Sequence, residues 1–488
     1  NTTLNLGGSL AVADTWTSDN TSVSLTDNAS LSSTAPLALA TLTTNGHDFD
    51  LDSVTTDLTL ANAFTLSAGK MSTHGADLIF ENSADISSDS TLDAGDGGKF
   101  EFKQGGTANG TINAESAVFK IGAAYAVPGT LKTNSSTTWD LTSNLDLSGG
   151  KLELGGAVTL DKILTDNGTT FKLGEDATVT RNQGFTLGSL DLDNSTFTLG
   201  SATTDLTLDL SDCSGTCNSP IGTLATEAAD LTILGAPTVI SGTTISSTGG
   251  IFTFGDGISL NGGTISLTGS TLVLGSSFTK TGGTLTLAGT DLELLSNLSL
   301  SSDAAVTVKE LRLENKTLTL QSTSSFTVAD QLMMDNTNER IIWDDNTSLA
   351  LSGGLKLGTN GELAWKNPGN LSIGNIVLNG GVLKIGETSG SQTFGLTSNL
   401  TLLADSEIYF NGGNILNYSG AEVSVGKVLT LGGNGQLQNT PDLNLGAGGK
   451  LKLSEISVAK VITSADSLGL DVADNSTVSS LSVAHTTP

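Results

Sequence analysis

The sequence feature that most restricts the fold lies between Gly249 and Leu294. Large apolar residues occur there in pairs two positions apart, and residues two apart point to the same face of a β-strand. Similar pairs return every 20 residues, as seen for Phe252 and Leu272, Ile258 and Phe278, Ile265 and Leu285, and Leu272 and Leu292. Three short strands per period predict an all-β fold, a three-sided parallel β-solenoid in which each coil stacks its apolar pairs on those of the coil before it.

The apolar rhythm runs through the whole chain, so we expect one continuous β-solenoid over residues 1–488. The rhythm is blurred before Trp139 and tightens there to a period of 19 residues, as between Trp139 and Val158 and between Leu152 and Phe171. A coil of about 20 residues predicts roughly 24 coils. It also favours a right-handed β-helix, because left-handed hexapeptide coils need about 18 residues.

Gly-Gly pairs directly precede many of the predicted strands. They lie at 97–98, 149–150, 249–250, 262–263, 282–283, 380–381 and 448–449. Glycine adopts positive φ without a steric penalty, so we expect these pairs to form corners where two walls of the solenoid meet. A phosphate-binding role is not indicated, because no GxxxxGK[ST] motif and no following helical pattern is present.

Two segments interrupt the rhythm. In the first, 211–220, Cys213 and Cys217 are predicted to form a local disulfide, since one CxxxC pair without a nearby histidine cannot supply four zinc ligands. Such a disulfide favours an oxidising, extracellular compartment. The second segment, 330–346, has few glycines and clustered charges. It is open to three interpretations: a bulged coil, an inserted loop or a contact surface.

The charge balance limits the partners. The chain has 50 acidic and 21 basic residues, a formal net charge of −29. A surface of this kind repels nucleic-acid phosphates and anionic lipid headgroups, so we expect no nucleic-acid partner and no direct membrane insertion. Divalent cations could bridge such molecules, and the acidic glycine turn at residues 93–98 leaves Ca²⁺ open as a cofactor; no other cofactor is expected.

No catalytic constellation is evident. β-Solenoid enzymes that cleave acidic polysaccharides line one wall with carboxylates and basic residues, whereas the arginines of this chain are isolated: Arg181, Arg312 and Arg340. HExxH, GxSxG and a Cys/His nucleophile pair are absent, and the three histidines are far apart in the sequence. We therefore expect no enzymatic activity, and we predict no catalytic, cofactor-binding or metal-ligating residue.

Two repeated phrases carry a resemblance to a known class of proteins. Gly282–Leu287 reads GGTLTL and Ser189–Leu199 reads SLDLDNSTFTL. This phrasing resembles bacterial β-helical surface proteins, including autotransporter passenger domains and filamentous-haemagglutinin-like adhesins. The resemblance lies in composition and period over nearly the whole chain, without a diagnostic motif. It implies an exported protein at the cell surface or in the extracellular space, with an adhesive or scaffold role.

The two ends of the predicted solenoid suggest how it assembles. The end coils of a solenoid expose strand edges that pair with another chain unless they are covered. Apolar residues at Leu4 and Leu6, and at Val478, Leu481 and Val483, continue the rhythm to both ends without a recognisable polar cap. We expect copies to join head to tail, by coil stacking or by strand exchange, because such a contact does not close on itself and builds filaments. These five residues are the candidate assembly residues.

A second function remains open at this point. The chain could be a monomeric adhesin or passenger that binds glycans or surfaces through its side walls or through the segments 211–220 and 330–346. A polysaccharide-active enzyme is a distant third.

Overall fold

The protein folds as a β-solenoid in the computed structural model. The structure describes residues 2–13, 16–95, 97–165, 168–210, 222–321, 325–334, 336, 339–343, 347–359, 361–365, 371–386, 392–420, 423–439, 443–464, 467, 469–473 and 475–484. Every regular element in these residues is a β-strand, and none is a helix. Parallel coils stack in about 20 turns of about 21 residues each. The turns are fewer and longer than the sequence predicted.

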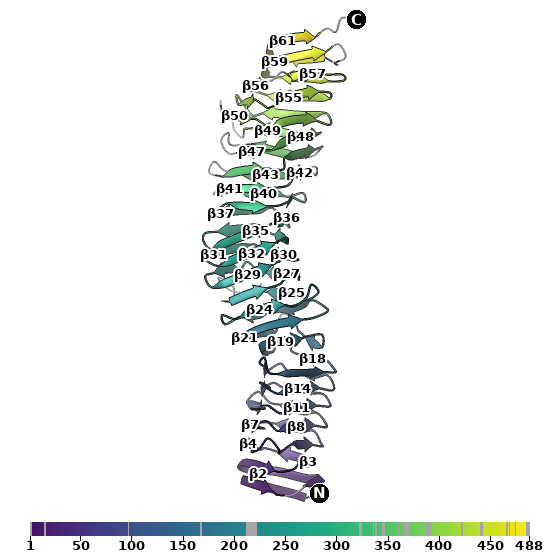
Figure 1. Ribbon diagram of the computed structural model, residues 1–488, viewed down its shortest axis with the longest axis vertical. Coiled ribbons are helices and arrows are strands. Elements are labelled where there is room, and N and C mark those ends of the chain that lie inside the picture. Colours follow the sequence, from purple (N-terminus) through teal and green to yellow (C-terminus); the bar gives the residue numbers. More distant parts are fainter. Residues whose placement is uncertain are drawn as a thin grey trace. The chain divides into compact units, whose positions relative to one another are not determined.

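The chain divides into two compact units. Unit 1 comprises Asn1–Gly235 and Ile240–Gly250, and unit 2 comprises Ala236–Val239 and Ile251–Pro488. Within each unit, most strands pair in parallel with the strand three positions later in the chain, so one coil contributes three strands (Figure 1). The three-sided coil is therefore confirmed. A single continuous solenoid and its right-handed winding stay predictions.

Unit 1 combines long strands that follow two walls around a corner with short strands that follow one wall. The long strands are β1 (Thr2–Val12), β2 (Thr17–Ser33), β3 (Leu37–Thr43), β19 (Lys151–Thr159) and β21 (Thr170–Thr180). The short strands of the first wall are β6 (Phe64–Leu66), β9 (Ala84–Ile86), β12 (Gly106–Thr107), β15 (Tyr125–Ala126), β18 (Leu145–Asp146), β20 (Ile163–Leu164), β22 (Phe185–Leu187), β25 (Leu206–Asp209) and β27 (Leu231–Leu234). Those of the second wall are β4 (Phe49–Leu51), β7 (Gly69–Ser72), β10 (Ser90–Asp93), β13 (Thr111–Asn113), β16 (Thr130–Lys132) and β23 (Ser189–Asp191). Those of the third wall are β5 (Leu58–Leu60), β8 (Asp77–Phe80), β11 (Lys99–Phe102), β14 (Val118–Ile121), β17 (Thr138–Leu141), β24 (Thr196–Leu199), β26 (Gly222–Ala225) and β29 (Thr243–Ser247).

Unit 2 repeats the three-strand coil more regularly. Its first wall contains β30 (Ile251–Phe254), β33 (Thr271–Leu274), β36 (Asp291–Leu294), β39 (Leu311–Arg312), β42 (Leu332–Met334), β45 (Leu355–Gly358), β48 (Asn375–Asn379), β51 (Asn399–Leu402), β54 (Val423–Val425) and β57 (Leu443–Leu445). Its second wall contains β28 (Thr238–Ile240), β31 (Ile258–Asn261), β34 (Ser277–Lys280), β37 (Leu298–Ser302), β40 (Thr317–Leu320), β43 (Arg340–Trp343), β46 (Glu362–Trp365), β49 (Val382–Ile385), β52 (Ser406–Phe410), β55 (Val428–Gly433), β58 (Lys450–Ser454) and β60 (Gly469–Ala473). Its third wall contains β32 (Thr264–Thr268), β35 (Thr284–Ala288), β38 (Val306–Val308), β41 (Ser325–Val328), β44 (Ser348–Leu351), β47 (Leu371–Ile373), β50 (Thr393–Leu396), β53 (Ile415–Tyr418), β56 (Gly435–Asn439), β59 (Ile456–Ser464) and β61 (Thr477–Ala484).

The predicted strand registers are largely confirmed. The ladders pair Phe252 with Leu272, Ile258 with Phe278, Ile265 with Leu285, Leu272 with Leu292, and Leu152 with Phe171. The predicted step from Trp139 to Val158 is wrong as a ladder step, because no ladder joins β17 to the second half of β19. That missing step opens a surface groove, which is described below.

The core is the stack of inward side chains, and its coils are held by apolar burial. Phe80 and Phe102 are fully buried, and their ring centroids lie 5.0 Å apart in neighbouring coils. Burying one such side chain contributes roughly 1.5–3 kcal/mol. Because every coil repeats this contact with the next, the stability of the fold accumulates coil by coil.

The glycine corners are confirmed. Each predicted Gly-Gly pair contains a residue with positive φ, and at Gly283 φ is 72°. A Cβ on Gly283 would lie 2.1 Å from the backbone oxygen of Gly263 in the coil before it, so the close approach of two corners also requires glycine. Non-glycine residues with positive φ, such as Asn45, Ser116 and Glu455, make further corners that the sequence did not predict.

The two irregular segments have different outcomes. Segment 211–220, with Cys213 and Cys217, lies outside the described residues. The strands that flank it are offset by 27 residues between Phe197 and Leu224. Segment 330–346 contributes β42 and β43, whose ladders to β45 and β40 are intact. Its coil has 23 residues, from Leu318 to Ile341, as other coils of unit 2 do, and the three interpretations of this segment stay open.

Candidate functional site

Among the described residues, three surface openings lie where one wall of a unit lacks a ladder between consecutive coils. At these openings, the strands that fail to pair are β17 with the second half of β19 in unit 1, and β35 with β38 and β39 with β42 in unit 2. The other walls of the same coils keep their ladders, as between β16 and β19 or between β34 and β37. The openings at β17–β19 and at β35–β38 therefore expose inward apolar residues without disrupting the stack.

The opening in unit 1, here named the β17–β19 groove, exposes an aromatic side chain. It encloses about 440 Å³. The residues that line it are Thr137, Trp139, Leu141, Ala157, Val158, Thr159, Asp161 and Lys162. Trp139 and Leu141 are partly exposed, although their ladder partners Phe119 and Ile121 in the coil below are fully buried. The floor of the groove is therefore made of inward core side chains that the next coil does not cover.

The corner beside this groove is tight. The carboxylate of Glu175 accepts a hydrogen bond from the backbone N–H of Ser135, two coils away. The coil between them passes this point as Gly155 and Gly156, and a Cβ on Gly156 would lie 2.5 Å from Cα of Ser135. The absence of side chains on these two glycines lets Glu175 connect the outer two coils across the middle one.

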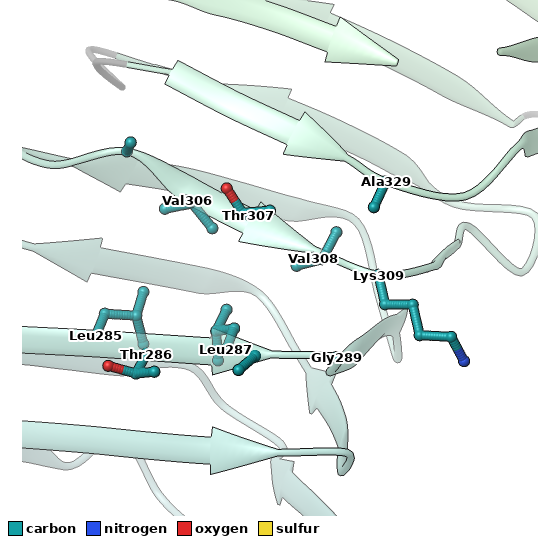
Figure 2. Close-up of a pocket in the computed structure, with 11 residues that line it drawn as sticks. Leu285, Thr286, Leu287, Gly289, Val306, Thr307, Val308, Lys309 and Ala329 are labelled. Carbon is teal, nitrogen blue, oxygen red and sulfur yellow. The ribbon is translucent and has the colours of Figure 1, made fainter. Parts of the chain in front are cut away.

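The second opening, between β35 and β38, is mainly apolar. It encloses about 410 Å³ and is lined by Leu285, Leu287, Val306 and Val308 together with small and hydroxyl residues. Leu285 is partly exposed, whereas its ladder partner Ile265 is 1% exposed. Figure 2 shows Leu285 and Leu287 on the same side of β35 and the side chain of Lys309 extending away from the opening.

The third opening, here named the 310–339 hollow, is polar. It encloses about 330 Å³ between β39 and β42, and it is lined by Glu310, Leu311, Arg312, Leu313, Glu314, Gln331, Met333, Asn336 and Glu339. Arg312 donates hydrogen bonds at 3.0 Å to Glu310 Oε1 and to Asp291 Oδ2. The bond from Arg312 lowers the pKa of Glu310 below its usual value, and the same pair raises the pKa of Arg312. Met333 is 49% exposed at the rim.

The outer face of unit 1 carries ladders of opposite charges. Lys99 and Lys120 both contact Glu101, at 3.2 and 3.5 Å, and Asp77 and Asp140 extend the ladder at its ends. Burial raises the pKa of Glu101, but the two lysines outweigh it and hold that pKa below its usual value. The acidic and basic side chains of this ladder therefore form ion pairs with one another.

The acidic turn that left Ca²⁺ open has a lysine partner. Asp93 lies 2.6 Å from Lys70 and accepts hydrogen bonds from the N–H of Gly95 and the side chain of Asn113. Burial raises the pKa of Asp93, whereas the Lys70 hydrogen bond and the Gly95 N–H lower it by more. Within the described ranges, no group of three or more His, Cys, Asp and Glu side chains is arranged to hold a metal ion.

The candidate assembly residues lie on the outermost described coils. Leu4 is partly exposed and Leu6 is 8% exposed on β1, which pairs with β2 alone. At the other end, β61 pairs only with β59; Val478 is partly exposed, Leu481 is 52% exposed, and the side chain of Val483 lies outside the described residues. The ladder partner of Leu481 is Val461, which is fully buried.

No family model, no curated protein and no solved structure matches this chain. The link to β-helical proteins is therefore the fold itself. In the part of the chain that the structure describes, no helix has the length and apolarity needed to cross a bilayer.

Proposed function

We propose that this chain is a non-enzymatic structural protein of the cell surface or extracellular matrix, a β-solenoid subunit that joins end to end into filaments. One observation carries the proposal. In the last described coil, Val472 and Leu481 are 50% and 52% exposed, whereas their ladder partners Leu453 and Val461 are 2% and 0% exposed. Over the residues that the structure describes, the apolar columns of the core thus continue to a rim of exposed apolar side chains.

A second copy is the partner that fits this rim. Its β1 runs in the same direction as the coils of the stack and presents Leu4, Leu6 and Leu10 with one unpaired edge, so that it would continue the parallel ladder.

The test compares two substitutions of equal chemistry at different places. Leu481→Asp puts a charge on the rim, and Met333→Asp puts one on a side wall where the native side chain is equally exposed, 49% against 52%. Burying the exposed half of a leucine in the contact contributes about 1 kcal/mol, and burying the charge of an aspartate there costs more. We therefore expect Leu481→Asp to weaken association at least about tenfold. Sedimentation velocity over a concentration series measures this. Equal association of both variants and the unaltered chain would refute the proposal.

A second function is favoured by the 310–339 hollow. Its guanidinium, carboxylate and amide groups, with the exposed Met333, offer donors, acceptors and an apolar contact to a sugar ring. The chain would then act as an adhesin or passenger that binds cell-surface glycans, in line with the bacterial β-helical surface proteins that its sequence resembles.

Glycan binding can be separated from assembly by location. Gln331→Ala and Asn336→Ala remove amide groups from the hollow, and Gln436→Ala removes one from a different wall of unit 2. Loss of binding on a glycan array for the first two alone would support the adhesin function. No binding by the unaltered chain, or no change in any variant, would contradict it.

A further inference from the structure

We propose that the β17–β19 groove binds one extended peptide strand of a partner protein, which fills the missing step of the wall by pairing with both neighbouring strands. The groove lies in unit 1 and uses none of the residues assigned to assembly or to the 310–339 hollow. The inference therefore stands or falls separately from the proposed function.

The lower edge of the groove presents backbone groups that no ladder uses. Thr138 and Thr142 donate their N–H groups downward to the carbonyl oxygens of Ala117 and Ile121, at 2.9 and 3.0 Å. In a parallel sheet, the N–H and C=O of alternate residues point to opposite sides of the strand. The N–H and C=O groups of Trp139 and Leu141 therefore point up into the groove.

The upper edge has the complementary arrangement. Leu160 donates its N–H upward to the carbonyl oxygen of Thr180 at 2.8 Å, and Val158 is paired with Val179 in the same ladder. By the same alternation, the N–H and C=O groups of Ala157 and Thr159 point down into the groove. Two strand edges thus face one another, and strand edges are the sites to which extended peptides add.

The width and floor of the groove also fit a strand. Paired strands lie about 4.8 Å apart, so a strand placed midway needs about twice that separation. β17 and the second half of β19 lie beyond ladder spacing, with about 440 Å³ between them, and the groove closes at the end where Gly156 lies against Ser135. The floor is apolar, because Trp139 packs on Phe119 with a ring-centroid distance of 5.9 Å and leaves Leu141 beside it partly exposed. One inward apolar side chain of the peptide would cover that floor.

The chemistry of the occupant follows from these features. Alternating side chains are required, with apolar residues on the inward face, as Trp139, Leu141 and Val158 are on the strands above and below. The net charge of −29 disfavours an acidic peptide, while the groove itself has one charge of each sign, Asp161 and Lys162. The partner segment is therefore an uncharged or basic strand with a Thr-Val type of alternation.

The test uses a fluorescent peptide, Lys-Thr-Val-Thr-Val-Thr-Lys with blocked ends, and the complete chain. Thr159→Pro removes an N–H that faces the groove and keeps those of Val158 and Leu160, which belong to the ladder with β21. Leu141→Glu places a charge in the floor. Leu285→Glu is the matched control, since it alters a leucine that is also partly exposed, in the β35–β38 opening.

The expected result is saturable binding in fluorescence anisotropy that weakens about tenfold or more in Thr159→Pro and Leu141→Glu, and is unchanged in Leu285→Glu. A peptide N-methylated at alternate residues loses one pairing edge and should bind as weakly. Hydrogen exchange across β21 checks that Thr159→Pro has folded. If it has not, the effect of Leu141→Glu on peptide binding alone tests the proposal. Absence of binding, or equal binding by all variants, overturns the proposal. So does binding of an oligosaccharide that Trp139→Ala abolishes while the peptide does not compete.

Discussion

Lys280 offers a direct test of how this core tolerates a charge. It occupies an inward position of β34 and is 5% exposed, in a column where the coil below has Leu260 and the coil above has Ser302. Its ammonium group contacts the carboxylate of Asp303, whose backbone N–H is bonded to the carbonyl oxygen of Lys280 at 3.0 Å. Asp303 is therefore held in place beside the only described partner of this ammonium group.

The two halves of this pair should respond differently to substitution. Removing the partner of a fully buried charge costs about 3–5 kcal/mol. Asp303 is 46% exposed, so water already reaches the pair, and we discount the cost of Asp303→Ala to about 1–3 kcal/mol. Lys280→Leu removes the charge and gives this position the same residue as Leu260 in the coil below. We therefore expect the free energy of unfolding to fall by less than about 1 kcal/mol, or to rise.

Local hydrogen exchange is the appropriate assay, because a solenoid need not unfold in one cooperative step. Protection of β34 and β37 should fall in Asp303→Ala and be kept in Lys280→Leu, with β14 of unit 1 as an internal reference. In the double variant, the loss caused by Asp303→Ala should vanish. The reasoning is refuted if Lys280→Leu is the more damaging substitution, or if Asp303→Ala leaves protection unchanged.

Three further predictions concern the corners and the surface ladders. Gly283→Ala forces an alanine to a φ of 72° and into contact with Gly263, so it should destabilise its coil by about 2 kcal/mol or more. In the control Gly174→Ala, a Cβ meets nothing within 4 Å, so the stability should change by less than about 0.5 kcal/mol in the same hydrogen-exchange assay. Asp93 and Glu101 have lowered pKa values in the folded chain, so their contribution to stability is complete above their usual pKa of about 4 and is lost as the pH falls below it. The urea midpoint of unfolding should therefore be level from about pH 7 to 5 and drop below about pH 4. A constant midpoint down to about pH 3 would contradict this. Glu175→Ala should raise exchange at the N–H of Ser135 while leaving the ladder of β19 with β21 protected, and unchanged exchange at Ser135 would argue against the connection across the glycine corner.

The repeating part of the fold was predictable because it depends on one local rule. Pairs such as Ile258 and Leu260 must face the core, and the 20-residue spacing places Phe278 directly over Ile258. Glycine pairs mark corners for a similarly local reason, since few other residues adopt positive φ at low cost. Corners made by Asn45 or Glu455 were not predictable, because their φ is imposed by the stacked coils around them.

The openings were beyond the reach of the sequence pattern. Leu285 occupies the same phase of the pattern as Ile265, yet it is partly exposed because β38, in the next coil, is not paired with β35. Trp139 and Val158 keep a regular 19-residue spacing even though their strands stand apart. Whether a ladder step forms depends on corner geometry several residues away, such as the Gly155–Gly156 corner. The spacing of apolar residues carries no information about this geometry. The 27-residue offset around segment 211–220 was signalled, in contrast, by the lapse in the apolar pairs.

The central claim is that copies join through their end coils, and electron microscopy of the purified chain tests it most directly. A concentration series should be imaged at low and at physiological salt, because a net charge of −29 on each copy opposes association until it is screened. We predict filaments that lengthen with concentration and with salt, and that are absent for Leu481→Asp. Separate particles at every concentration and salt level, or filaments that persist unchanged in Leu481→Asp, would contradict it.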